Sequence, residues 1–190
     1  NVDKESERFL SFERWWNGFC SLSEEEITAT VENLFIGNKI ERGEMVLDEH
    51  CAIDLKDIKN PLLIFASEGD EITPPRQALH WIRVVYPDTK ALKKTGQRIV
   101  YLINPHVGHL GIFVSAKVAK LEHRAILENT ADIESLKPGL YEMIIDNPTG
   151  DPDCSRDQYE VRFEERLVED ICESVPQDSF EAVRSVSEKN

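Results

Sequence analysis

A carboxylate and an imidazole follow two apolar segments of the sequence. Asp70 comes just after residues 62–66, and His109 comes shortly after residues 98–103. Both segments are short, rich in branched and aromatic residues, and bounded by turn-forming residues, which predicts buried strands of a sheet. A buried carboxylate that holds one imidazole nitrogen orients the ring and stabilises its charged form, so that the other nitrogen can take a proton from a nucleophile. These two residues therefore indicate acid–base chemistry.

A predicted helix connects the two strands and determines how the side chains meet. It covers residues 74–86, with Thr73 as its N-cap and with Leu79, Ile82 and Val85 on its buried face. Strands joined through a helix lie parallel, so both trailing loops reach the same edge of the sheet. We expect Asp70 and His109 to meet there, and Gly108 to give the second loop the backbone freedom that this requires.

The segments before the first strand are expected to be helical. Aromatic side chains recur at helical spacing at Phe9, Phe12, Trp15, Trp16 and Phe19, which predicts a core-facing stripe; the alternative is a lid that faces a ligand. Ser23 and Glu26 form a capping box. It opens a second helix, with apolar residues inward and with Gly37 as its left-handed end.

The segments after His109 predict a further helix and a hairpin. Apolar residues at Val114, Val118, Leu121 and Ala125 favour one longer helix. Residues 140–145 and the alternating residues 159–163 favour an antiparallel pair of strands. Residues 171–186 predict a weak helix.

Composition restricts the kinds of partner and compartment. The net charge of −14 argues against nucleic acid and against anionic membrane surfaces. The sequence contains neither an apolar run long enough to span a bilayer nor a signal peptide at its start, so we expect a cytoplasmic protein without a transmembrane segment. The four cysteines have no metal-ligand spacing, which favours reduced thiols.

Several motifs in fixed order resemble the polyhydroxyalkanoate synthases. They are the stretch 33–44, residues 53–61 with the pattern Asp-Leu-x-x-Ile-x-x-Pro, the motif Asp70-Glu71-Ile72-Thr73-Pro74, and Gly108-His109-Leu110-Gly111. Over most of its length the chain is more similar to a bacterial group labelled polyhydroxyalkanoate synthase-like, through Glu-Arg-Trp-Trp, Ile-Thr-Pro-Pro and Gly-His-Leu-Gly-Ile-Phe-Val-Ser. This resemblance implies an α/β-hydrolase fold and acyl transfer from a thioester to a hydroxyl, or the related hydrolysis. It also implies that Asp70 is the triad acid and His109 the general base.

The nucleophile of such a triad is missing from the sequence. In this fold it lies on a G-x-S-x-G elbow between a strand and a helix. No two glycines of the chain are four residues apart, and Cys20, which follows Gly18, ends an aromatic helix instead of a strand. We therefore expect an interior or C-terminal piece of a larger protein, whose N-terminal half supplies the nucleophile, and we expect the isolated chain to be inactive.

Two further clusters in the sequence contain residue types that can bind metal. His106 and His109 lie near Asp70 but are only three residues apart on a loop, without a third clear ligand, so a metal site is not expected there. The Asp-rich loop 146–153 does not have the spacing of a calcium-binding EF-hand loop. A small basic cluster could meet an acyl-coenzyme A, but a solvated helix face is the simpler interpretation. Its members are Lys90, Lys93, Lys94 and Arg98. We expect no cofactor and no metal.

The sequence thus predicts an α/β protein with a partial hydrolase-like parallel sheet, flanking helices and a C-terminal α+β extension. We expect a helical cap-like segment at residues 1–59, the C-terminal half of a hydrolase core at 60–136 and an acidic extension at 137–190. The expected function is that of an acyltransferase or esterase fragment that carries Asp70 and His109 and acts on an ester or acyl thioester. The alternative is a noncatalytic interaction or assembly module. An exposed sheet edge predicts self-association.

Overall fold

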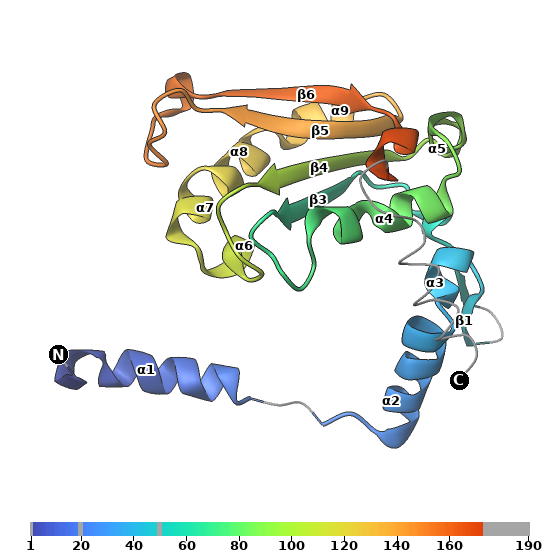
Figure 1. Cartoon of the computed structure of the whole chain (residues 1–190), viewed down its shortest axis with the longest axis horizontal. Helices are drawn as coiled ribbons and strands as arrows, with labels where there is room; N and C mark the ends of the chain where they lie inside the picture. Colours follow the sequence, from blue (N-terminus) through green and yellow to red (C-terminus); the bar gives the residue numbers. More distant parts are fainter. Residues whose placement is uncertain (1, 19–20, 49–50, 173–190) are drawn as a thin grey trace. The chain divides into compact units, whose positions relative to one another are not determined.

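The computed structural model describes residues 2–18, 21–48 and 51–172 of the chain. The chain divides into two compact units, residues 1–38 and residues 39–190. The larger unit holds the main sheet and both candidate residues, and its elements are shown in Figure 1.

The main sheet of the larger unit has four strands in the order β3-β4-β5-β6. The strands β3, β4 and β5 are parallel, and β6 is antiparallel to β5. The predicted parallel strands and the predicted hairpin are therefore confirmed, as is the α/β class of the fold. The bounds are Leu62–Ser67 for β3, Arg98–Asn104 for β4, Gly139–Asp146 for β5 and Glu160–Arg166 for β6.

Helices cover both faces of this sheet. On one face α4 (Pro75–Val85) and α5 (Thr89–Thr95) pack against alternate residues of the strands, and the other face meets α8 (Glu122–Glu128) and α9 (Thr130–Ser135). The predicted buried face of α4 is confirmed, since Leu79, Ile82 and Val85 are all buried. The N-cap of α4 is Pro74 and not Thr73, so the predicted start was one residue early.

The predicted single helix after Gly111 is wrong. The structure instead has α6 (Gly111–Val114), α7 (Ala116–Lys120) and α8 in succession. Ser115 has extended backbone angles, and its hydroxyl accepts a hydrogen bond from the Val118 amide, so it ends one helix and caps the next. A Ser inside an apolar helical pattern competes for the backbone in this way.

The remaining elements of the larger unit are short. The segment η4 (Val168–Cys172) is tied to the start of α5, because the Thr89 hydroxyl donates to the Glu169 carboxylate and accepts from the Val168 amide. Of the predicted helix 171–186, all but its first two residues lies outside the described residues. The others are α3 (Lys39–Arg42), β1 (Met45–Asp48), β2 (Cys51–Ile53), η2 (Leu55–Asp57) and η3 (Arg156–Gln158).

The smaller unit contains α1 (Val2–Trp16), α2 (Glu24–Thr30) and the π-helical η1 (Val31–Ile36). The capping box at Ser23 and Glu26 is confirmed, with both reciprocal hydrogen bonds formed. The left-handed end at Gly37 is wrong: its φ is −77°, and Asn38 has the positive φ of 47° instead. Asn is among the residues that tolerate this conformation.

The prediction that the aromatic stripe of α1 is core is wrong for this chain. Trp15 is 63% exposed and Trp16 is 56% exposed, and Phe9 and Phe12 are exposed as well. The Phe12 and Trp16 rings stack on each other, with centroids 5.9 Å apart, so these rings find contacts within their own helix. The apolar residues of α2 and η1 are likewise not buried. Phe19 lies outside the described residues.

None of the described helices has the length and apolar character needed to cross a lipid bilayer.

Candidate functional site

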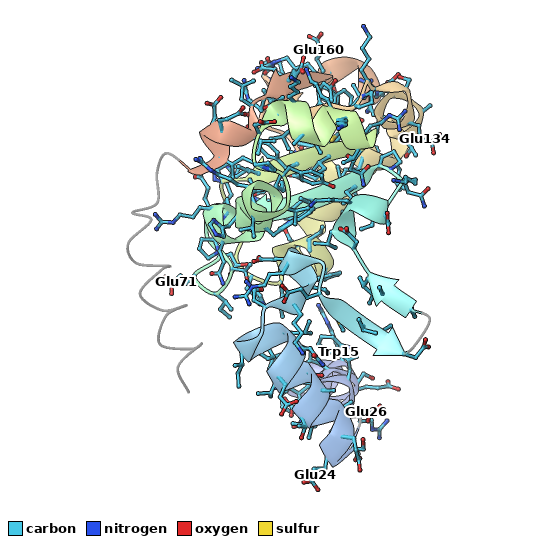
Figure 2. All side chains as sticks on the ribbon, turned by 90° about the vertical axis from the view of Figure 1, so that its right-hand side faces the viewer. Trp15, Glu24, Glu26, Glu71, Glu134 and Glu160 are labelled. Carbon is cyan, nitrogen blue, oxygen red and sulfur yellow. The ribbon has the colours of Figure 1, made fainter. Side chains whose placement is uncertain are left out.

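Asp70 lies in the loop that follows β3 and is held there by backbone groups. Its side-chain Oδ1 accepts hydrogen bonds from the amides of Ile72 and Thr73, both at 2.8 Å. Its own amide donates to the Ser67 carbonyl at 3.2 Å. The residue is 8% exposed, whereas the next residue, Glu71, is exposed on the same loop (Figure 2). One carboxylate oxygen is thus fixed, and the other, Oδ2, is left for a partner.

Asn104 organises the loop that carries His109. It is the last residue of β4 and is buried, and its side-chain Oδ1 accepts from the amides of His106 at 2.8 Å and Val107 at 3.1 Å. Its amide group donates to Glu122 of α8. Our sequence analysis missed this role, although an Asn-Pro pair directly after a strand is typical of such a turn.

The two loops approach each other backbone to backbone. The Glu68 amide donates to the Asn104 carbonyl at 2.9 Å, which extends the pairing of β3 and β4 into the loops. A Cβ atom on Gly69 would lie 2.7 Å from the Val107 carbonyl oxygen, closer than real contacts allow. Gly69 is therefore required for this approach. The role predicted for Gly108 is not observed, because its φ is not positive and a Cβ there would meet only the Gly69 oxygen at 3.7 Å.

The structure brings Asp70 and His109 together, as the sequence predicted. The His109 Nδ1 lies 2.9 Å from Asp70 Oδ2, within hydrogen-bond distance. The Asp70 side chain is 9% exposed and the His109 side chain is 44% exposed. The acid is therefore buried, and the base is accessible to solvent. With an ionised carboxylate, Nδ1 carries the proton and donates it to the hydrogen bond, which leaves Nε2 as the acceptor.

The surroundings of Asp70 favour its charged form. Burial raises the pKa of this carboxyl, but the hydrogen bonds from Thr73, His109 and Ile72 outweigh burial and hold the pKa below the ordinary value for aspartate. An acid that stays ionised at neutral pH is what an orienting and charge-stabilising partner of histidine requires.

The other predicted sites contain groups that are already engaged. In the basic cluster, Lys93 pairs with Glu165 at 2.5 Å, and Arg98 donates to the Leu136 carbonyl. In the Asp-rich loop, Asp153 pairs with Lys120. Within the described ranges, three or more potential metal ligands do not gather at any point.

Among the described residues, two cysteines have side chains that the structure describes as free thiols, and neither is assigned to the site. Cys51 is exposed and Cys154 is buried in the core beside α8, and both are free thiols. Cys20, the half-match to a nucleophile elbow, lies outside the described residues. Neither of these two thiols is therefore assigned as the nucleophile of the Asp–His pair.

A groove of about 440 Å³ lies beside α4 but does not include the pair. Its lining combines apolar residues such as Leu79 and Ile171 with Arg166. Arg166 is already paired with Glu142 at 2.7 Å and with Glu164 at 2.5 Å, so its charge is satisfied within the sheet. We assign no chemistry to this groove.

Comparison with known proteins gives a family and one curated relative. A family model described as "Protein of unknown function (DUF3141)" matches residues 1–190. A protein of Rhizobium meliloti, described as an uncharacterized protein in the ackA 5' region, is 42% identical over 174 residues. The match covers 90% of this chain but 24% of the relative, so the chain spans about a quarter of the relative's length. No solved structure shows a significant match.

Proposed function

This chain belongs to the DUF3141 family, and we propose that it supplies the acid–base half of an acyl-transfer or ester-hydrolysis site of the polyhydroxyalkanoate synthase-like type. The observation that carries the proposal is the 2.9 Å contact between His109 Nδ1 and Asp70 Oδ2, with Asp70 Oδ1 fixed by two amides. The carboxylate is buried and the imidazole is accessible. A buried acid beside an accessible base suits a histidine that must meet a nucleophile from another part of the protein.

The nucleophile comes, in this proposal, from a part of the protein that this chain does not contain. The relative from Rhizobium meliloti has about three quarters of its length outside the matched region, which is ample for the missing half of a hydrolase-like core. The site would then combine a nucleophile from that part with the base and acid of this chain.

The proposed reaction proceeds through an acyl-enzyme. As a hydroxyl or thiol nucleophile attacks the thioester carbonyl, His109 Nε2 takes its proton and Asp70 stabilises the resulting imidazolium. Collapse of the tetrahedral adduct breaks the carbon–sulfur bond, and the imidazolium gives its proton to the leaving thiol. A second hydroxyl, from a growing ester chain or from water, then loses its proton to His109 and forms a bond to the acyl carbon. The bond between the acyl group and the enzyme nucleophile breaks, and the imidazolium returns its proton to that nucleophile.

The direct test uses a chimera in which residues 1–190 of this chain replace the matching region of the Rhizobium meliloti relative. The chimera should release free thiol from a short-chain acyl-coenzyme A, or p-nitrophenol from its acetate ester. His109→Ala should lower turnover by about 10²–10⁴-fold while the chimera remains folded. His106→Ala, three residues away on the same loop, is the matched control and should retain turnover. Unchanged turnover in His109→Ala would refute the proposal.

The second candidate is a noncatalytic interaction or assembly module. It is favoured by the exposed aromatic rings of α1, since large apolar surfaces on a helix mark sites of association. Under this alternative the chimera has no thioesterase or esterase activity above background, and the Asp70–His109 contact serves only to fasten the two loops.

A further inference from the structure

The two edges of the main sheet differ in chemistry. Figure 1 shows β3 and β6 as its outermost strands, and each pairs with only one strand of the described sheet. A strand edge exposes unpaired N–H and C=O groups, and proteins protect such edges with charged residues, prolines, bulges or covering elements. The comparison of β3 with β6 therefore shows which edge is protected against pairing.

The β6 edge carries charge along its length. Its sequence from residue 160 to residue 166 is Glu-Val-Arg-Phe-Glu-Glu-Arg. Arg162 pairs with Glu164 at 2.9 Å, and Arg166 pairs with Glu142 on the neighbouring strand. Glu160 extends from this strand into solvent (Figure 2). A further strand would have to strip water from these groups, which makes pairing here unfavourable.

The β3 edge has none of this protection within the strand itself. Its six residues read Leu-Leu-Ile-Phe-Ala-Ser, with neither a charge nor a proline, and its register with β4 is continuous from Leu62 to Ser67. Leu63 is 37% exposed, although its partner on β4, Val100, is fully buried. Half of the backbone groups of a strand point away from its partner, so those of β3 have no strand to bond on this side.

We propose that β3 is an internal strand of a larger sheet, and that its free edge receives a strand from the region that the relative carries outside its match to this chain. Three observations support this occupant: the uncharged edge, the exposed Leu63, and the three quarters of the relative that lie outside the matched region. The added strand has apolar side chains on both faces. On one face of the sheet it continues the apolar surface of Leu63 and Phe65, and on the other face that of Leu62 and Ile64.

The added strand is parallel to β3. Parallel strands carry their trailing loops to one edge of the sheet, so its loop would arrive beside Asp70. This orientation rests on the proposed function, whereas addition of the strand does not. A noncatalytic module would also need a strand paired with β3. The experiment therefore measures strand pairing and not turnover.

The test compares amide hydrogen exchange of the 190-residue chain with that of the chimera. The amides of β3 that do not bond to β4 should exchange rapidly in the chain and more slowly in the chimera, by about tenfold or more, as expected for gaining one hydrogen bond each. The amides of β6 are the internal control and should exchange alike in both. Equal exchange of β3 in the two proteins would overturn the proposal.

A pair of variants in the chimera locates the effect. Leu63→Lys places a charge on the β3 edge and should return its amides to rapid exchange, while Glu160→Lys places the same charge on β6 and should leave β3 protected. Slow exchange of the β4 amides in both variants shows that the sheet remains folded. Protection of β3 that survives Leu63→Lys would overturn the proposal.

Discussion

Gly69 and Val107 lie so close that a single methyl group on Gly69 would meet the Val107 carbonyl oxygen at 2.7 Å. These residues belong to the loops that carry Asp70 and His109, so their contact sets the separation of the two side chains. The closeness is between backbones, and a backbone can yield only by moving a whole loop.

Gly69→Ala should therefore destabilise the chain by about 1–3 kcal/mol, as overpacking does. Gly108→Ala is its matched control, because the added Cβ would meet the Gly69 oxygen at an ordinary 3.7 Å. It should be neutral or slightly stabilising, since alanine has fewer conformations in the unfolded chain. Urea unfolding of the two variants measures the difference. Equal stabilities would mean that the loops do not pack as described.

Asn104→Ala should cost about 1–3 kcal/mol and disorder the His109 loop, because the amides of His106 and Val107 lose their buried acceptor. Asn147→Ala is the control: its side chain also bonds within a turn, but in an exposed loop, and the expected change is within about 0.5 kcal/mol. Denaturant unfolding again gives the values. A tolerated Asn104→Ala would contradict the role that we assign to this residue.

The Asp70 carboxylate should make stability depend on pH in the acid range. Its native pKa lies below that of the unfolded chain, about 3.9, so its contribution is fully present above that value and is lost as pH falls through the native pKa. The stability difference between the wild type and Asp70→Asn should therefore be constant near neutrality and shrink below about pH 4. Glu71→Gln is the control, because it removes a charge from the same loop but leaves the hydrogen bonds from the Ile72 and Thr73 amides to Asp70 intact. A difference that grew on acidification would have the wrong sign.

Tryptophan fluorescence tests the exposure of the α1 stripe. Trp15 and Trp16 are more than half exposed, whereas Trp81, a residue of α4, is partly buried against the core. Removing Trp81 with a Phe substitution should leave emission typical of indole in water, with strong quenching by acrylamide. Short-wavelength emission that resists quenching would show that the stripe is buried after all.

The part of the fold that sequence periodicity predicted best is the parallel pair β3 and β4. Both strands are continuous apolar runs between turn formers, and the connection through α4 makes them parallel, so their trailing loops reach the same edge of the sheet. The meeting of Asp70 with His109 followed from that topology alone.

Periodicity failed where a polar residue or a missing partner decided the outcome. Ser115 interrupts an apolar pattern that otherwise continues through α7 and α8, and its cap cannot be detected from spacing. The α1 stripe is apolar enough for a core, but burial needs a second surface, and the pattern of one helix does not show whether that surface exists. The support from Asn104 and Gly69 depends on contacts between distant loops.

The most direct test of the proposed acid–base pair is a double-mutant cycle on turnover in the chimera. Asp70→Asn, His109→Ala and their combination are compared through kcat/KM for the same acyl-coenzyme A. If the two residues act as a unit, the double variant is no slower than His109→Ala alone, because the acid works only through the imidazole. Losses that add, or turnover that survives His109→Ala, would contradict the account.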